Sequence, residues 1–349
     1  MSRVHPRFRS LSTLSLVVTL GVILWGAYVR ASGSGAGCGS HWPTCNGEVI
    51  PRSPSSATLV ELTHRVTSGL SALLVLGQLV WARRLFPVDH PVRSPVRWAA
   101  LFMFGEVLIG AGIVILKYVA MDQSFGRAVW VALHLVNTFL LVGSLGLVAW
   151  RSAGARRFDL EGKGLTVGLG VVCVALILAT GATGAIAALG DTLFPAKSLG
   201  SALREDFSPA SHWLVQLRVV HPFLAVMTAF VLLAVRQVVD SRADSREVSY
   251  AGTQLRVSVV CQVALGFVNM LMLAPTWMQL AHLLVSQYVW LALVRFFATA
   301  LEAAPTDLYE ALGIEPTEAE IAEGGSLTVR GLEAADAGDA PVEGLPSHE

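Results

Sequence analysis

Long apolar stretches alternate with short polar connections along most of the chain. A helix needs roughly 20 apolar residues to cross a bilayer core of about 30 Å, and eight stretches are long enough. They fall at about residues 9–29, 61–82, 97–118, 128–150, 164–189, 212–236, 252–274 and 277–299. This pattern predicts an all-α integral membrane protein with eight transmembrane helices.

The composition supports this interpretation and excludes a soluble domain. Hydrophobic residues make up 54% of the chain and charged residues only 14%, with a mean hydropathy of +0.60. Arg3, Arg7 and Arg9 precede the first stretch, as in a signal peptide. No small-residue cleavage site follows directly and seven further spans do, so we expect a retained helix.

The charges are distributed unevenly. The tail after Leu301 carries twelve of the 25 acidic residues and only one of the 25 basic ones, Arg330, so the rest of the chain is strongly positive. This tail is rich in Ala, Gly and Glu and has no sustained apolar period. We therefore expect residues 301–349 to be disordered and solvated.

Basic residues gather in every second connection between the predicted helices. They are Arg83, Arg84, Arg93 and Arg97, then Arg151, Arg156, Arg157 and Lys163, and finally Arg236, Arg242, Arg246 and Arg256. The positive-inside rule then places these connections and both termini in the cytoplasm.

Four histidines, each near the start of an even-numbered span, are the main candidates for chemistry. His64 and His221 are 157 residues apart, and His134 and His282 are 148 apart. Under the predicted topology all four lie in one layer near the outer surface. The spacing indicates two pseudo-repeated four-helix bundles, residues 1–155 and 156–300, each able to hold a metal cofactor between two helices.

Neutral imidazoles are good iron or copper ligands, and two opposed imidazoles make a low-spin heme site. Glu61 lies three residues before His64, so its carboxylate stands one helical turn outward of the ring. Arg65 and Arg218 are candidates to pair with heme propionates. The alternative is structural: helix capping by Glu61, interhelical hydrogen bonds for the histidines, and arginines that extend to the membrane interface.

Two cysteines, Cys38 and Cys45, lie in the Gly-rich loop after the first span. On the oxidising side of the membrane a disulfide is favoured over a free dithiol. A zinc site that adds His41 would lack a fourth ligand. Cys173 and Cys261 lie within helices, and we expect them to pack in the core.

Glu106 and Gln262 are 156 residues apart and lie within corresponding spans. We expect both to form hydrogen bonds between helices in the interior. A proton path through Glu106 is the second interpretation. Asp240 and Asp244 spell the DxxxD motif of polyprenyl transferases, but the motif occurs once, in a short basic connection, and indicates solvated surface.

Several short motifs occur in an order that resembles the heme A synthase family over about residues 10–300. They are Gly33–Cys38 with Trp42, Pro43 and Cys45, Glu61-x-x-His64-Arg65, Leu133-His134-Leu135, Leu189-Gly190-Asp191-Thr192, Leu217-Arg218-x-x-His221-Pro222 and Ala281-His282-Leu283. The resemblance implies oxidation of the C8 methyl group of heme O to a formyl group through hydroxylated intermediates, which gives heme A for terminal oxidases.

The same resemblance implies roles for individual residues. His64 and His134 would flank the substrate heme, and His221 and His282 would ligate a resident heme b that relays electrons. Glu61 matches the family's functional acid, for which we hypothesise proton acceptance or water positioning at the methyl carbon. Cys38 and Cys45 match an outer-loop cysteine pair. Some members carry a second pair, but residues 190–211 contain no cysteine.

The resemblance also implies that the protein is located in the bacterial plasma membrane. Membrane lipid and heme O are the expected binding partners. A heme O synthase, an electron acceptor and further copies of the chain are candidate partners, and no feature points to nucleic acid. A bis-histidine electron-transfer cytochrome and a heme carrier are the alternatives. The cytochrome gives no reason why an acid stands beside His64, whereas Arg218 takes that place beside His221.

Overall fold

The computed structural model describes residues 5–154, 157–243 and 245–302, and the predicted disordered tail from residue 303 lies outside them. Within the described ranges every regular element is a helix, and β-bridges are confined to single residues, as between Cys45 and Glu48. This confirms the predicted all-α class.

Eight helical segments of the described chain are long and apolar enough to cross a membrane, as predicted. They are α1 (Pro6–Ala31), α2 (Ser56–Leu85), α3 (Arg93–Ile115), α4 (Phe125–Arg151), α5 (Gly164–Leu193), the run of α7 (Trp213–Gln216), η2 (Leu217–Val219) and α8 (Val220–Ala243), α9 (Arg246–Leu271) and α10 (Thr276–Ala300). The connections contain the 3₁₀ turn η1 (Ser34–Ala36) and the short helix α6 (Leu199–Asp206).

Local sequence explains where several of these helices begin and break. The hydroxyl of Ser55 accepts from the backbone N–H of Thr58 at 3.1 Å and caps α2. Ser124 caps α4 through the N–H of Arg127 at 3.2 Å. The 3₁₀ turn before α8 precedes Pro222, whose ring removes one backbone donor and crowds the carbonyl one turn earlier.

α3 and α9 end in the same way. The N–H of Tyr118 donates to the carbonyl of Ile113 at 2.9 Å, and that of Ala274 donates to Asn269 at 2.8 Å. The residue just before each donor, Lys117 or Leu273, has a positive φ. This arrangement is common at helix C-termini. The two ends are 156 residues apart, the same spacing as Glu106 and Gln262.

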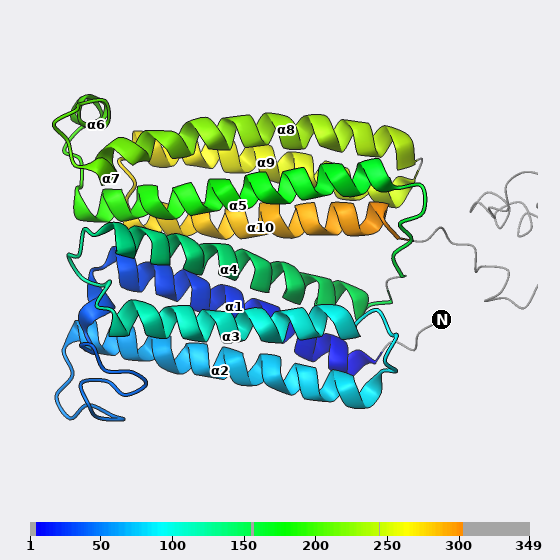
Figure 1. Ribbon diagram of the computed structural model, residues 1–349, viewed down its shortest axis with the longest axis horizontal. Helices are drawn as coiled ribbons and strands as arrows, with labels where there is room; N and C mark the ends of the chain where they lie inside the picture. The colour runs from blue at the N-terminus through cyan, green and yellow to red at the C-terminus, as the bar shows by residue number, and fades with distance from the viewer. Residues whose placement is uncertain (1–4, 155–156, 244, 303–349) are drawn as a thin grey trace, which may run out of the picture. The chain divides into compact units, whose positions relative to one another are not determined.

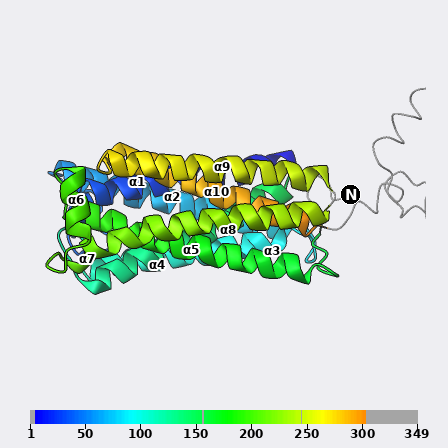
Figure 2. The ribbon, with the colours of Figure 1, turned by 90° about the horizontal axis from the view of Figure 1, so that it is seen from above.

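The long helices form two groups of four (Figure 1). In the first group α1, α2, α3 and α4 pack in sequence and α4 closes against α1, so α2 and α4 stand on one diagonal. In the second group α5, α8, α9 and α10 close in the same way, which puts α8 and α10 on a diagonal. α4 packs against α5 and α10, and α1 against α10, along the seam between the groups. The predicted division near residue 155 falls in the α4–α5 connection. Figure 2 shows the long helices running along one direction.

Apolar side chains lie both inside the groups and on their outer surface. The largest cluster includes the fully buried Cys173 and Phe296, whereas Phe230 is 71% and Phe104 61% exposed, as expected for side chains that contact lipid. The prediction that Cys173 packs in the core is confirmed. The same prediction for Cys261 is wrong, because its side chain is exposed.

Candidate functional site

The four histidines lie on the diagonal helices of the two groups. His64 on α2 and His134 on α4 belong to the first group, and His221 on α8 and His282 on α10 belong to the second. The spans that carry them all begin at the end of the molecule that holds α6 and α7 (Figure 1). In the second group the His221 and His282 rings are perpendicular, with centroids 6.3 Å apart. This arrangement brings two imidazoles together in the second group.

Three of these rings lie against a glycine of a neighbouring helix. A Cβ placed on Gly26 of α1 would lie 2.7 Å from Cε1 of His64. On Gly184 of α5 it would lie 2.9 Å from Cε1 of His221, and on Gly266 of α9 the same distance from Cε1 of His282. Any larger residue would displace the ring, so the glycines set the positions of the imidazoles.

Polar contacts distinguish the two nitrogens of each ring. Nδ1 of His221 lies 3.1 Å from the carbonyl of Thr180, which favours the tautomer with a free Nε2. Nε2 of His282 lies 3.2 Å from the amide nitrogen of Gln262. The buried Nδ1 atoms of His64 and His282 have no hydrogen-bond partner among the described residues.

Glu106 connects α3 to α4 beside His134. Its Oε2 lies 3.0 Å from Nδ1 of His134, and its Oε1 accepts from Asn137 at 2.7 Å and from Thr138 at 3.1 Å. The predicted interhelical hydrogen bonding of Glu106 and Gln262 is confirmed. The carboxylate lies against Nδ1, so Nε2 of His134 is the nitrogen left to face a ligand.

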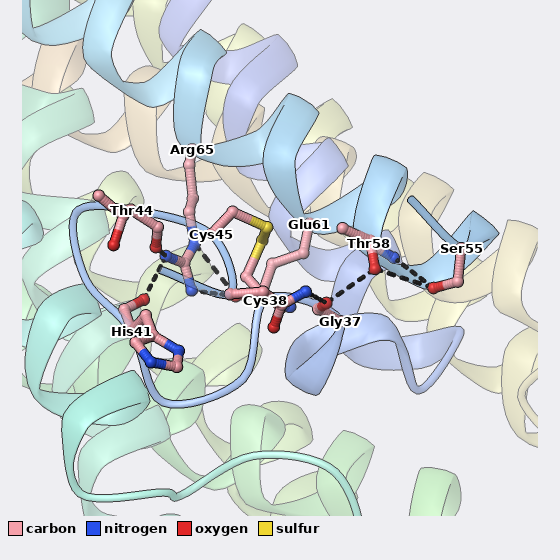
Figure 3. The surroundings of a disulfide bond; sticks show 10 residues. Gly37, Cys38, His41, Thr44, Cys45, Ser55, Thr58, Glu61 and Arg65 are labelled. Carbon is pink, nitrogen blue, oxygen red and sulfur yellow. Dashed lines mark hydrogen bonds and ion pairs between the residues drawn. A yellow bond between two sulfur atoms is a disulfide. The ribbon is translucent and has the colours of Figure 1, made fainter. Parts of the chain in front are cut away.

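Cys38 and Cys45 form a disulfide, as predicted, in the loop that covers the start of α2 (Figure 3). Glu61 is 3% exposed, and its Oε2 accepts from the backbone N–H of Cys38 at 2.8 Å. Its Oε1 accepts from the guanidinium of Arg65, at 3.1 Å from Nε. The same arginine donates to loop carbonyls, those of His41 at 2.6 Å and Thr44 at 2.7 Å. Glu61 and Arg65 therefore form a buried clamp between the disulfide loop and α2.

Arg218 takes the place of Glu61 in the second group and also lies against protein oxygens. Its guanidinium lies 2.8 Å from Asp206 of α6 and 3.2 Å from Asp191 of α5, and it donates to the carbonyl of Phe194. Both arginines predicted to bind propionates thus contact protein oxygens. Their role toward a propionate stays a prediction.

Two further features escaped the sequence analysis. Arg30 of α1 donates to Ala188 and Thr192 of α5, both at 2.7 Å, and to Gln279 of α10 at 3.0 Å, and so joins the two groups. An arginine in the last turn of an apolar helix was the available signal. Asp240, expected on a solvated surface, pairs with Arg236 at 3.0 Å and is largely covered, and Asp244 lies outside the described residues.

The sequence profile of the cytochrome oxidase assembly protein family matches residues 9–294, which include all four histidines and the disulfide. The chain belongs to this family. The predicted resemblance is thereby confirmed at the level of the family.

Two kinds of named protein are among the relatives of this chain. A protoheme IX farnesyltransferase of Thermus thermophilus is 42% identical over 319 residues, which cover 89% of this chain and 50% of the relative. A heme A synthase of Alkalihalophilus pseudofirmus is 35% identical over 111 residues, 32% of this chain and 37% of the relative. One of Symbiobacterium thermophilum is 32% identical over 163 residues, 46% and 51% of the two chains. The chain spans about half the length or less of these curated relatives.

The donor sets of this family member fit a heme better than a single metal ion. Among the described residues no group of three or more His, Cys, Asp or Glu side chains could hold an ion. Two metal–nitrogen bonds of about 2.0 Å each, with the half-widths of two imidazoles, span about 6 Å. The 6.3 Å between the ring centroids of His221 and His282 is close to that span, so these two residues would hold one iron between them. Ligation by this pair stays a prediction.

Proposed function

We propose that this protein is a heme A synthase, which oxidises the C8 methyl group of heme O to a formyl group for terminal oxidase assembly. Membership of the cytochrome oxidase assembly family supports this proposal, as do relatives named heme A synthase. The observation that carries it is the pairing of histidines on the diagonals of both helix groups. Such pairs suit a planar ligand held edge-on between helices.

The two groups would have different roles. In the second group His221 and His282 would hold a heme b, which supplies one-electron transfer when bound. Thr180 fixes the ring of His221 and Gly184 gives it room. In the first group His64 and His134 would bind the substrate heme O. The differences between Glu61 and Arg218, and between Glu106 and Gln262, support one reactive site and one relay.

Glu61 would act on protons at the substrate. Conversion of a methyl to an aldehyde removes electrons in successive two-electron steps, and each step also releases a proton from the carbon or the attached oxygen. An ionised carboxylate one turn from His64 can accept such a proton or orient a water molecule. Arg65 balances its charge, and the N–H of Cys38 fixes one of its oxygens.

The proposal includes a location and an origin for the fold. The basic connections support cytoplasmic termini in a bacterial plasma membrane, with the histidines near the outer face. Two correspondences support a duplicated four-helix unit. α3 and α9 end in the same way, and the rings of His64 and His221 each lie against a glycine of the neighbouring helix.

A prenyltransferase that forms heme O would be the natural supplier of the substrate. The relative named protoheme IX farnesyltransferase shares 42% identity with this chain over half of its own length. A stretch similar to this chain therefore occurs in a longer protein with that name, which supports close cooperation between the two activities. An electron acceptor is the other partner that the oxidation requires.

Acid–acetone extraction tests the function directly. The protein is expressed with a heme O-forming prenyltransferase, and the hemes are separated by chromatography. Heme A or a hydroxylated heme O is expected, and both should disappear with His64→Ala. Heme b alone, with heme O unconverted despite a supply of oxidant and reductant, would indicate an electron-transfer cytochrome. Heme O bound but unchanged would indicate a carrier.

A further inference from the structure

Helices α1 and α2 face each other in a constant antiparallel register. Gly26 lies against His64, and the hydroxyls of Thr19 and Ser71 share a hydrogen bond of 2.8 Å. Phe8 and Ala82 belong to one buried cluster. In each of these three pairs the residue numbers of the two partners add to the same sum, as they must where two antiparallel helices keep one register. The register therefore puts Ser12 at the level of Gln78.

Five polar residues are buried on the facing sides of α1 and α2 below His64. Ser12, Ser15 and Gln78 are 0% exposed, Ser71 is 2% and Thr19 is 3%. We call these five residues the polar file. Ser12 and Thr19 donate to carbonyls of their own helix, at Phe8 and Ser15. The hydroxyl of Ser15 and both amide atoms of Gln78 have no hydrogen-bond partner among the described residues.

Buried amides and hydroxyls in native proteins are almost always hydrogen-bonded, and water supplies the bond where protein does not. The polar file carries no charged side chain, so a small neutral ligand suits it better than an ion. Gln78 offers two donors and one carbonyl acceptor, and a hydroxyl both donates and accepts. These groups can relay a hydrogen-bonded chain of water molecules.

The second helix group provides an internal comparison. The spacing from Gly26 to Gly184 relates α1 to α5, so Ser12, Ser15 and Thr19 correspond to Gly170, Cys173 and Ile177. The spacing from His64 to His221 relates α2 to α8, so Gln78 corresponds to Val235. Cys173, Ile177 and Val235 all belong to one apolar cluster. Of the file, only Ser71 keeps a polar counterpart, Thr228, which bonds Thr180 at 2.8 Å. The polar file is therefore a property of the group that contains Glu61.

The file has two distinct ends. On α2 it runs from Ser71 to Gln78, or about 10 Å along a helix that rises 1.5 Å per residue, and Ser71 lies about the same distance from His64. Below Gln78 the buried ring of Phe8 packs edge-on against Trp81 and Phe86. This aromatic cluster separates the file from the end of the molecule that holds the basic connections.

We propose that the polar file binds a chain of water molecules and carries protons away from the site at His64, from the level of Ser71 to that of Gln78, where the Phe8 cluster limits exchange with the end that holds the basic connections. The path serves the proposed synthase, because each oxidation step at the substrate carbon releases a proton from a site enclosed by helices and a disulfide loop. The presence of water can be measured without any turnover.

Radiolytic labelling tests the hydration. Val75 lies level with Ser15, and Leu232 is its counterpart in the second group. Val75→Met and Leu232→Met are prepared in the full chain and exposed to X-rays in ¹⁸O-water, and methionine oxidation is measured by mass spectrometry. We expect at least about fivefold faster ¹⁸O uptake at position 75, because hydroxyl radicals arise from bound water beside it. Equal rates at the two positions would overturn the proposal.

A second variant assigns the water to Gln78. Adding Gln78→Leu, which copies the apolar second group, should remove the excess labelling of Met at position 75. If the labelling persists, the water is not held by Gln78 and the assignment of the file is wrong. In turnover, Gln78→Leu should slow heme O conversion about tenfold and raise the solvent deuterium isotope effect, with unchanged heme content. An unchanged isotope effect would overturn proton transfer.

These outcomes separate the path from the proposed function. If the unaltered protein makes no heme A, the synthase assignment fails whatever the labelling shows. If it makes heme A but Met at position 75 stays unlabelled, only the path fails.

Discussion

Nδ1 of His134 lies 3.0 Å from the carboxylate of Glu106. In the second group the corresponding pair is joined differently, because the amide of Gln262 meets Nε2 of His282 at 3.2 Å. A carboxylate beside a ligating imidazole orients the ring and makes it a more basic ligand. In the proposed synthase, His134 would therefore be a more electron-donating ligand than His282.

Glu106→Gln should make the first site resemble the second. The loss of the carboxylate should raise the midpoint potential of the heme bound there and lower product formation about 10- to 100-fold. Potentiometric titration followed by optical and electron paramagnetic resonance spectra measures the first effect, and heme extraction measures the second. Gln262→Glu is the matched control and should lower the potential of the other heme. Unchanged potentials in both variants would contradict the role of Glu106.

The sequence predicted the helices, and that the four histidine-bearing spans begin at one end of the molecule, because both depend on local composition. A membrane span shows itself as a run of apolar residues, and the start of that run gives the position of His64 or His282 along its helix. The exposed Cys261 shows the limit of this reasoning. Lipid-facing and core-facing positions are both apolar in a bilayer, so the pattern cannot separate them.

Contacts between distant segments could not be predicted in the same way. The bond from the N–H of Cys38 to Glu61 depends on how a loop folds back over α2. Arg30 reaches Gln279 across 249 positions of the chain. Neither partner carries a local signal, since any carbonyl or amide near the guanidinium would serve equally well.

Glu61→Gln should leave both hemes bound and abolish their conversion. The neutral amide cannot accept the proton, and Arg65 loses its charge partner. Because Arg65 is buried, loss of the pair should also destabilise the protein by about 3 kcal/mol. Heme extraction and thermal unfolding measure the two effects. Glu48→Gln is the control, since the side chain of Glu48 contacts Arg52 at the exposed surface and its change should alter neither property. Full conversion by Glu61→Gln would contradict the role of Glu61 as the proton acceptor.

Removal of the disulfide should loosen the clamp around Glu61. The loop between Cys38 and Cys45 supplies both carbonyls that Arg65 bonds and the N–H that Glu61 bonds. A double Cys38→Ser, Cys45→Ser variant should lose roughly 2–3 kcal/mol of stability and much of its product formation. Thermal unfolding with and without dithiothreitol provides the control, because the reductant should lower the Tm of the natural protein and not that of the variant. Normal product formation in the double variant would show that Glu61 and Arg65 hold their geometry without the bridge.

Substitution of the glycines that contact the histidine rings gives the sharpest test of the histidine positions. A Cβ on Gly184 would stand 2.9 Å from Cε1 of His221, so Gly184→Ala must push the imidazole out of place. We expect loss of most of the low-spin heme absorption from the second group, while heme in the first group is kept. Gly168→Ala in the same helix is the matched control, since nothing lies within 4 Å of its Cβ. That change should leave the spectrum intact and stabilise the helix by up to about 1 kcal/mol, because alanine is the better helix former. Retention of heme by Gly184→Ala at the level of Gly168→Ala would show that His221 does not ligate it from this position.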